Sequence, residues 1–401
     1  MTPARRPRIR GGTPITRRAV LGRMGAFAGA GLVGPGLLAA CGDDDDGGGG
    51  GDDGVDSTSK ALWFDNWPAY IDEETVVPDT EGAEGLFADT SGLEFRYTEN
   101  INDNGTWFSE NQQLLADKKP IGPDIVAPSY WMVARLIGLE WVRELPLDDI
   151  PNASNLVPEL QKPDWDPTGK FSLPWQSGMT GIAYNRSVTG RDLTSVADLY
   201  DPEFKGKIGM LTEMRDTLGL TMLLLGDDPA TATMDSASAA FEKIEQAVAD
   251  GQIRQFTGND YMDDLTTGNF AACVGWSGDI SQLALDNPDL AFAIPEEGGM
   301  QWSDVMAIPA GAENVANAAV WMNYVYDPEN AARITAYVGY NSPVAGVREI
   351  LAAGDDFEKA LSESVLLYPD DETLSRLHVF ASLEEDVELE FEDRFGGIIG
   401  A

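Results

Sequence analysis

Residues 207–225 have the sequence KIGMLTEMRDTLGLTMLLL, which contains the repeating unit of the predicted fold. The apolar start predicts a strand, the acids Glu213 and Asp216 follow where it ends, and an apolar helix comes next. Strands and helices alternate in this way from Lys60 onward, which indicates an α/β protein with mainly parallel sheets flanked by helices. Because ligands of such sheets bind outside the carboxyl ends of the strands, the two acids are candidate binding residues.

A second stretch, residues 300–309 (MQWSDVMAIP), places an aromatic ring two positions before a carboxylate. In an extended segment Trp302 and Asp304 point to the same side. Together they suit a small organic cation, because the ring quadrupole attracts the cation and the carboxylate pairs with it. The alternative is a core tryptophan beside a solvated aspartate, and this stretch alone leaves both interpretations open.

Aromatic and polar motifs stand at strand ends or at breaks along the whole body. They are Trp67 with Tyr70, Ser129 with Trp131, Glu213 with Asp216, Trp276 alone, and Trp302 with Asp304. Core aromatics could lie anywhere along a strand, whereas a binding site gathers such residues at strand exits. The clustering therefore favours a composite ligand site.

Hydrophobic periodicity gives the expected elements. Strands are predicted at residues 61–66, 93–100, 123–128, 171–175, 181–185, 207–212, 269–275, 290–295 and 305–309. Helices are predicted at residues 107–118, 132–139, 193–200, 217–225, 235–250, 315–326, 328–338 and 382–395. Asp235 is the expected N-cap of its helix, and residues 148–166 are expected to form a surface excursion.

The composition limits the partners of the chain. Its 401 residues suggest two lobes or domains. With 27 Lys and Arg against 67 Asp and Glu, the formal net charge is −40, which argues against binding to nucleic acid or to anionic lipid. The charge fits a cationic ligand, although an acidic surface can also serve solubility or a salty habitat.

The N-terminus has the layout of an export signal. Residues 1–41 contain seven Arg and no acid, and a Gly/Ala-rich apolar run leads to Cys41. Residues 16–21 (TRRAVL) resemble a twin-arginine signal, and residues 38–41 (LAAC) resemble a lipobox in which Cys41 is lipidated. The Gly/Asp-rich residues 42–59 form the predicted tether. A transmembrane anchor is the alternative, but the apolar run is too interrupted by glycine.

Several kinds of catalytic and cofactor chemistry lack their motifs. The only histidine, His378, is expected on a surface helix, and no Cys-x-x-Cys, His-x-x-x-His or phosphate-binding Gly-Lys loop is present, so no cofactor or metal is expected. Cys273 is expected to be an inert thiol in a buried strand. Carboxylate-only glycoside hydrolysis stays open, since Asp216 and Asp304 could form an acid pair.

Six short motifs agree in order and spacing with a known family. They are Asn66-Trp67-x-x-Tyr70, Pro128-Ser129-x-Trp131, Met214-Arg215-Asp216, Gly275-Trp276, Gly298-Gly299-x-x-Trp302-x-Asp304-x-x-Ala307-Ile308-Pro309 and Gly339-Tyr340-x-x-Pro343. Through them the chain from about Lys60 to its end resembles the polyamine (spermidine/putrescine) substrate-binding proteins of ABC importers. The resemblance implies a two-lobe periplasmic-binding-protein (type II) fold. Residues 60–178 with 306–341 would form lobe 1, and residues 179–305 with 342–401 lobe 2, with crossovers near Gly178, Met306 and Asn341.

The resemblance also implies roles for the site residues. Aromatic rings would box the ligand's methylene chain and ammonium groups, carboxylates would bind its nitrogens, and hydroxyl groups would add contacts. The aromatic rings are those of Trp67, Trp276 and Trp302. The carboxylates are those of Glu213, Asp216 and Asp304. The hydroxyl groups are those of Tyr70, Tyr340 and Ser129. The implied protein is a monomer that passes a small cation to ABC permease subunits, held by its lipid on the outer face of the cytoplasmic membrane.

The chain departs from the family pattern at a few positions. Pro68 replaces a small hydroxyl residue, Trp131 stands where Tyr is common, and Glu213 stands where Asp is common. The polar residue that the family supplies from its C-terminal helix has no clear match in residues 377–386. These departures leave the ligand's chain length open, and a betaine-like cation, an amino acid derivative or a sugar stays an alternative ligand.

Overall fold

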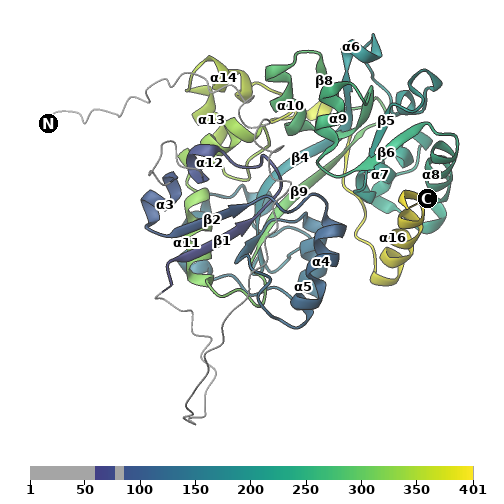
Figure 1. Ribbon diagram of the computed structural model, residues 1–401. Helices are drawn as coiled ribbons and strands as arrows, with labels where there is room; N and C mark the ends of the chain where they lie inside the picture. The colour runs from purple at the N-terminus through teal and green to yellow at the C-terminus, as the bar shows by residue number, and fades with distance from the viewer. Residues whose placement is uncertain (1–58, 77–84, 401) are drawn as a thin grey trace, which may run out of the picture. The chain divides into compact units, whose positions relative to one another are not determined.

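The computed structural model describes residues 59–76 and 85–400, and two long antiparallel strands lie at its centre (Figure 1). Strand β4 (Ser172–Asn185) pairs with β9 (Gly299–Ala307) in a register that runs from Ser172 opposite Ala307 to Thr180 opposite Met300. The predicted export signal, Cys41 and all of the predicted tether except its last residue lie outside the described residues.

The other strands extend the sheet on both sides of this pair, so the predicted α/β class with a mixed, mainly parallel sheet is confirmed. The strand order is β2-β1-β3-β9-β4-β7-β5-β6, with β10 beside β9 and β8 beside β4. Two parallel groups flank the central pair: β1 (Ala61–Asp65), β2 (Glu94–Thr98) and β3 (Ile125–Val126) on one side, and β5 (Ile208–Leu211), β6 (Ile253–Thr257) and β7 (Ala272–Trp276) on the other. The short strands are β8 (Leu290–Ala293) and β10 (Leu377–His378).

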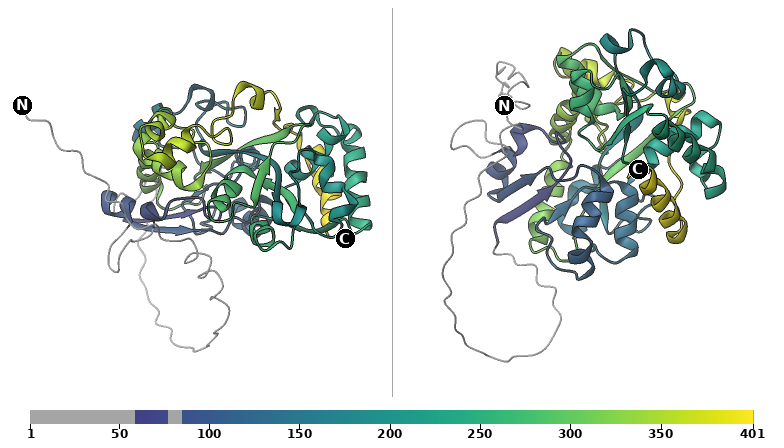
Figure 2. Two further views of the ribbon diagram at one scale, coloured as in Figure 1. Left: turned by 90° about the horizontal axis from the view of Figure 1, so that it is seen from above. Right: turned by 45° about the vertical axis from the view of Figure 1, so that its right-hand side comes forward.

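Helices lie on both faces of the sheet (Figure 2). The longer helices are α4 (Asn104–Ala116), α5 (Tyr130–Gly138), α7 (Met214–Leu225), α8 (Met234–Ala249), α10 (Ser277–Asp286), α11 (Val315–Val325), α12 (Pro328–Val338) and α16 (Glu385–Ile399). The shorter helices are α2 (Glu73–Val76), α3 (Leu86–Ser91), α6 (Arg186–Thr189), α9 (Tyr261–Thr267), α13 (Val347–Ala352), α14 (Asp356–Ser362) and α15 (Asp371–Leu374). No helix of the described residues is long and apolar enough to cross a membrane.

The prediction of separate strands at residues 171–175 and 181–185 was wrong, because β4 is continuous through the polar residues between them. There, Gln176 and Ser177 pair with Asp304 and Ser303 of β9. The Ser177 and Ser303 hydroxyls are 2.7 Å apart, and Ser177 also forms a bridge with Asn341. Three distant segments thus meet beside the predicted crossover at Gly178, while the lobe boundaries stay a prediction.

Three local predictions have clear outcomes. His378 lies on strand β10, not on a surface helix, because Leu377 and His378 pair with β9. The N-cap of α8 is Thr233, not Asp235, since the Thr233 hydroxyl accepts from the backbone N–H of Ser236. Cys273 is a fully buried free thiol in β7, as predicted.

Candidate ligand-binding site

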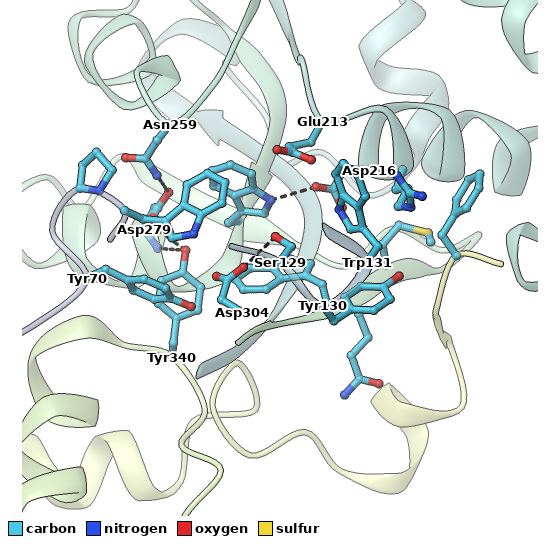
Figure 3. A pocket seen from close by; sticks show the side chains of 18 residues that line it. Tyr70, Ser129, Tyr130, Trp131, Glu213, Asp216, Asn259, Asp279, Asp304 and Tyr340 are labelled. Carbon is cyan, nitrogen blue, oxygen red and sulfur yellow. Dashed lines mark hydrogen bonds between the residues drawn. The ribbon is translucent and has the colours of Figure 1, made fainter. Parts of the chain in front are cut away.

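One pocket gathers every residue that the sequence singled out for ligand binding (Figure 3). It encloses about 590 Å³ of free space, which includes its opening to solvent. The predicted residues that line it are Trp67, Tyr70, Ser129, Trp131, Glu213, Asp216, Trp276, Trp302, Asp304 and Tyr340. We call this pocket the slot; that its residues bind a ligand stays a prediction.

The topology explains why these residues meet. Trp67 follows β1, Ser129 follows β3, Glu213 follows β5, and Trp276 ends β7. These are the carboxyl ends of strands in the two parallel groups, so their side chains converge. Trp302 and Asp304 come from the middle of β9 and lie on the same side of that strand, as their two-residue spacing predicts.

Four aromatic rings form a continuous wall of the slot. The ring centroids are 5.7 Å apart between Trp67 and Trp276, 6.2 Å between Trp276 and Trp302, and 5.5 Å between Trp302 and Tyr340. The two Trp–Trp pairs are edge-to-face, a favourable arrangement of ring quadrupoles. The Trp67 indole N–H donates to the Ala127 carbonyl at 2.9 Å, which fixes the first ring.

The wall depends on a glycine of β4. A Cβ atom at Gly178 would lie 2.6 Å from Cζ2 of Trp302 and 2.9 Å from Cδ1 of Tyr340. Both distances are shorter than van der Waals contact, so any side chain here would displace the two rings. The absence of a side chain at position 178 therefore lets these rings pack on the strand.

Asp304 is the carboxylate at the centre of the slot. It is 4% exposed, and the Ser129 hydroxyl donates to its Oδ1 at 2.7 Å. Burial raises the pKa of Asp304 to about 7, and the hydrogen bond from Ser129 opposes that rise only in part. Tyr70 lies nearby, but its hydroxyl makes no hydrogen bond of good geometry with any described atom. Asp304 and Tyr70 thus keep unused hydrogen-bonding capacity.

Asp216 orients two of the tryptophans. Its Oδ2 accepts from the Trp276 indole N–H at 3.1 Å, and its Oδ1 accepts from the Thr180 hydroxyl at 2.7 Å. The same Thr180 oxygen accepts from the Trp302 indole N–H at 3.0 Å. Burial raises the pKa of Asp216 to about 6, and the hydrogen bonds from Thr180 and Trp276 limit the rise.

Glu213, at the start of α7, is bound by a residue of another helix, Asn104 of α4. Its Oε1 accepts from the backbone N–H of Asn104 at 2.7 Å and from the Asn104 side-chain amide at 2.8 Å. Burial is the main reason why the pKa of Glu213 rises to about 8, and Asp216 adds to the rise. Asn104 begins α4 and also donates to the Ser129 hydroxyl at 3.0 Å. Glu213 therefore links α7 to α4 at the edge of the slot.

A fourth carboxylate, Asp279, was missed by the sequence reasoning. It lies on α10, three residues after Trp276, and is 5% exposed. Its oxygens accept from Tyr340 at 2.7 Å, Tyr261 at 2.8 Å and Asn259 at 3.2 Å. Burial raises the pKa of Asp279 to about 6. The available signal was that an acid one helical turn after a strand-end aromatic points back toward that strand's carboxyl end.

The remaining lining residues were also not predicted. They are Pro68, Tyr130, Arg215, Asn259, Met300, Gln301 and Phe380. The Oδ1 of Asn259 is buried and accepts no hydrogen bond from the described residues. Phe380 belongs to residues 377–386, where the sequence has no match for the polar residue of the family's C-terminal helix. Its apolar ring lines the slot.

Comparison with known proteins assigns the chain to a family. The family model "Bacterial extracellular solute-binding protein" matches residues 88–360, which is more than half of the chain. The chain belongs to this family of bacterial extracellular solute-binding proteins. The family is extracytoplasmic, and its members bind solutes for transport.

Relatives of this solute-binding protein have informative names. "Spermidine/putrescine-binding periplasmic protein 1" of Haemophilus influenzae is 26% identical over 343 residues, 85% of this chain and 89% of its own. "Putrescine-binding periplasmic protein PotF" of Escherichia coli is 28% identical, over 70% of this chain and 77% of its own. The solved spermidine/putrescine ABC transporter substrate-binding protein PotD of Streptococcus pneumoniae is 26% identical with a TM-score of 0.66, over 85% of this chain and 98% of its own. The expected periplasmic-binding-protein fold is therefore confirmed.

The slot of this solute-binding protein is strongly acidic, and Arg215, which also lines it, is paired with Glu388 instead of with a slot carboxylate. Among the residues that the structure describes, no Lys, Arg or His side chain forms an ion pair with Asp216, Asp279 or Asp304. The same part of the chain holds no group of three or more His, Cys, Asp or Glu placed to bind a metal ion. The arrangement suits an organic cation that supplies the missing positive charge.

Proposed function

We propose that this solute-binding protein captures a polyamine, spermidine or putrescine, in the slot and delivers it to an ABC importer. The observation that carries the proposal is the aromatic wall with Asp304, Asp216 and Asp279 beside it, none of them ion-paired within the described chain. A polyamine has what this arrangement lacks: ammonium groups joined by apolar methylene segments. The names of the relatives, which bind spermidine or putrescine, support the same ligand class.

The physical terms are large enough for useful affinity. Binding a flexible polycation costs ordering entropy and the desolvation of its ammonium groups. Charge-assisted hydrogen bonds contribute about 1.5–3 kcal/mol each, and cation–π contacts contribute about 0.5–2 kcal/mol each. Asp304 is the strongest candidate anchor because its burial outweighs the hydrogen bond from Ser129 and raises its pKa to about 7.

The roles of the other lining residues follow from their positions. Trp67, Trp276 and Trp302 would enclose the methylene chain, while the Tyr70 hydroxyl and the Asn259 carbonyl oxygen would accept from ammonium N–H groups. Glu213 would act at the edge of the slot. Trp131 would close the opposite side, and Tyr340 and Ser129 would hold Asp279 and Asp304 in place.

Delivery to a membrane transporter requires export, and the sequence supports a specific route. Twin-arginine export, lipidation at Cys41 and residues 42–59 as the tether together would hold a monomer on the outer face of the cytoplasmic membrane. ABC permease subunits would be its partners. No catalytic role is proposed, since the family binds solutes for transport.

Closure of two lobes around the ligand is part of the proposal. Residues 60–178 with 306–341 would move against residues 179–305 with 342–401 by bending at the crossovers. The meeting of Ser177, Ser303 and Asn341 at one place supports a hinge there. A ligand that contacts both lobes favours the closed form, which the importer can then recognise.

One observation favours a second candidate, a zwitterionic solute such as a betaine or an amino acid derivative. Arg215 lines the slot, is 7% exposed, and its Nε makes no hydrogen bond with the described residues. A ligand carboxylate could bind Arg215 while its cationic end binds Asp304. The slot carboxylates outnumber this one guanidinium, which is why the polyamine is the first candidate.

Calorimetric titration separates the two candidates. The exported chain would be titrated with putrescine, spermidine, glycine betaine, amino acids and sugars under one set of conditions. The proposal predicts micromolar or tighter affinity for at least one polyamine and no measurable heat from uncharged sugars. Binding of a zwitterion with no binding of any polyamine would replace the first candidate by the second.

A further inference from the structure

The C-terminal helix α16 touches the slot indirectly, through two lining residues. Phe391 packs edge-on against Phe380 with ring centroids 6.3 Å apart, and Glu388, almost one turn earlier, binds Arg215. Both Phe380 and Arg215 line the slot, whereas none of the described side chains of α16 does. The helix therefore contacts the slot through other side chains.

Four charged residues connect α16 to two other helices. Glu388 accepts from Nη2 of Arg215 on α7 and lies 3.2 Å from Nη2 of Arg135 on α5, and Arg135 also binds Glu392. We call Arg135, Arg215, Glu388 and Glu392 the clamp. The side chains of Arg215 and Glu388 are 8% and 14% exposed, so solvent screens their interaction only weakly.

The clamp contacts Trp131, which lines the slot. The guanidinium carbon of Arg215 lies 3.9 Å from the centroid of the Trp131 ring, and that of Arg135 lies 5.3 Å from it. Trp131 lines both the slot and a wider outer groove that also includes Trp165 and Leu389. The ring is therefore one of the side chains that the two spaces share, and a ligand leaving on this side would pass it.

We infer that Glu388 is a positioning residue that holds Arg215 and Arg135 against Trp131, so that α16 keeps this wall closed and slows ligand release. The helix itself is anchored elsewhere, because Phe391 and Phe395 pack against Phe241 of α8 and Phe256 of β6. Glu388 is thus not needed to attach α16 to the protein, and its contacts can position the arginines beside Trp131. The part of the inference that concerns release rests on the proposed function, whereas the part that concerns the wall does not.

Two variants test the inference, and each removes an ion pair that α16 forms with another helix. Glu388→Gln keeps the size and a hydrogen-bonding group but removes the charge that holds both arginines. The matched control is Glu245→Gln. Glu245 of α8 forms an ion pair with Arg394 of α16, with 3.4 Å between Oε1 and Nε, and neither residue lines the slot. Stopped-flow tryptophan fluorescence with putrescine and spermidine should show ligand release about five- to tenfold faster in Glu388→Gln, with association within about twofold. Release in Glu245→Gln should match the wild type.

A ligand-independent measurement keeps the wall testable if the proposed function fails. Amide hydrogen exchange in α5, which carries Trp131 and Arg135, should be faster in ligand-free Glu388→Gln than in the wild type or in Glu245→Gln. Equal effects of the two variants on release or exchange would reduce Glu388 to a helix-docking residue, and unchanged values in Glu388→Gln would overturn the inference. A wild type that binds no polyamine would reject the proposed function, and the exchange comparison would still decide about the clamp.

Discussion

The slot and the clamp both gather acidic side chains close to Trp131, and they differ in what neutralises them. In the clamp, Glu388 and Glu392 are paired with Arg135 and Arg215. In the slot, Asp304 receives one short hydrogen bond from a neutral hydroxyl and has no ion pair within the described chain. The contrast separates charges that stabilise the protein from charges that are left for a ligand.

The physical consequence is visible in the raised pKa values of the slot acids. Burial raises the pKa of Asp304 to about 7, of Asp216 and Asp279 to about 6, and of Glu213 to about 8. A buried carboxylate without a cation is costly when ionised. The ligand-free protein therefore carries a destabilised site, and a polycation would relieve it.

The largest effect is expected from Asp304→Asn, which removes the charge but keeps the side-chain volume. Polyamine affinity should fall by about 1.5–3 kcal/mol, or roughly 10- to 150-fold, because one charge-assisted interaction is lost. The melting temperature of the ligand-free variant at pH 8 should be equal to or higher than that of the wild type, because a buried charge is removed. Calorimetry and thermal unfolding measure the two quantities. Unchanged putrescine and spermidine titrations would show that Asp304 does not pair with the ligand and would contradict its proposed role.

The loss of polyamine affinity on lowering the pH should be about as large as the loss caused by removing one charge-assisted hydrogen bond. A bound ammonium favours the ionised slot acids, so binding below pH 7 must release protons from groups such as Asp304 and Asp216. Affinity should fall about tenfold between pH 7.5 and pH 6 for one coupled proton. Titrations in buffers of different ionisation enthalpy count the released protons, and a pH-independent affinity without proton release would contradict the raised pKa values.

The stability of the ligand-free protein should change with pH in the opposite direction. The folded-state pKa values of the slot acids lie above those of the unfolded chain. Their contribution to stability is therefore fully present below about pH 4, the unfolded value, and is lost as the pH rises through about 6 to 8. Thermal unfolding at several pH values, compared between the wild type and Asp304→Asn, measures this contribution. The variant should show the shallower loss.

A smaller effect is expected from Trp302→Phe. The variant keeps an aromatic ring beside Gly178 but weakens the ring quadrupole and removes the hydrogen bond to Thr180. Affinity should fall by about 0.5–1 kcal/mol, or roughly two- to fivefold. If Trp302 were only a core residue, the melting temperature would fall instead while the measured affinity stayed the same.

The smallest effect is expected at the outer end of the clamp. The Glu392 side chain is 32% exposed, and Arg135 is its one ion-pair partner among the described residues. Glu392→Gln should change stability by less than about 1 kcal/mol, as for partly exposed ion pairs, and leave affinity within about twofold. A loss of affinity comparable to that of Asp304→Asn would contradict the separation of slot and clamp.

The sequence predicted the slot better than its surroundings because strand ends leave a local signal. Trp302 and Asp304 share a face through a spacing of two, and Trp276 ends an apolar strand, so each was found without knowledge of tertiary contacts. Asp279 was missed because its role depends on Tyr340, 61 residues away in the chain.

The clamp left no local signal of comparable strength. Glu388 and Glu392 have the spacing of neighbours on an exposed helical face, and only the fold shows that Arg135 and Arg215, more than 170 residues earlier, lie beside them. The continuity of β4 through Gln176 and Ser177 was missed for a related reason. Those polar residues are buried by pairing with β9, which local hydrophobicity does not indicate.

A crystal structure of the protein grown with putrescine or spermidine tests the central claim most directly. The account predicts an ammonium nitrogen within about 2.7–3.1 Å of an Asp304 carboxylate oxygen, the distance of a charge-assisted hydrogen bond. It also predicts methylene groups against Trp276 and Trp302, with Glu388 still bound to Arg215. A polyamine bound only in the outer groove, with the slot empty of cation, would contradict the claim that the unpaired slot carboxylates are the ligand site.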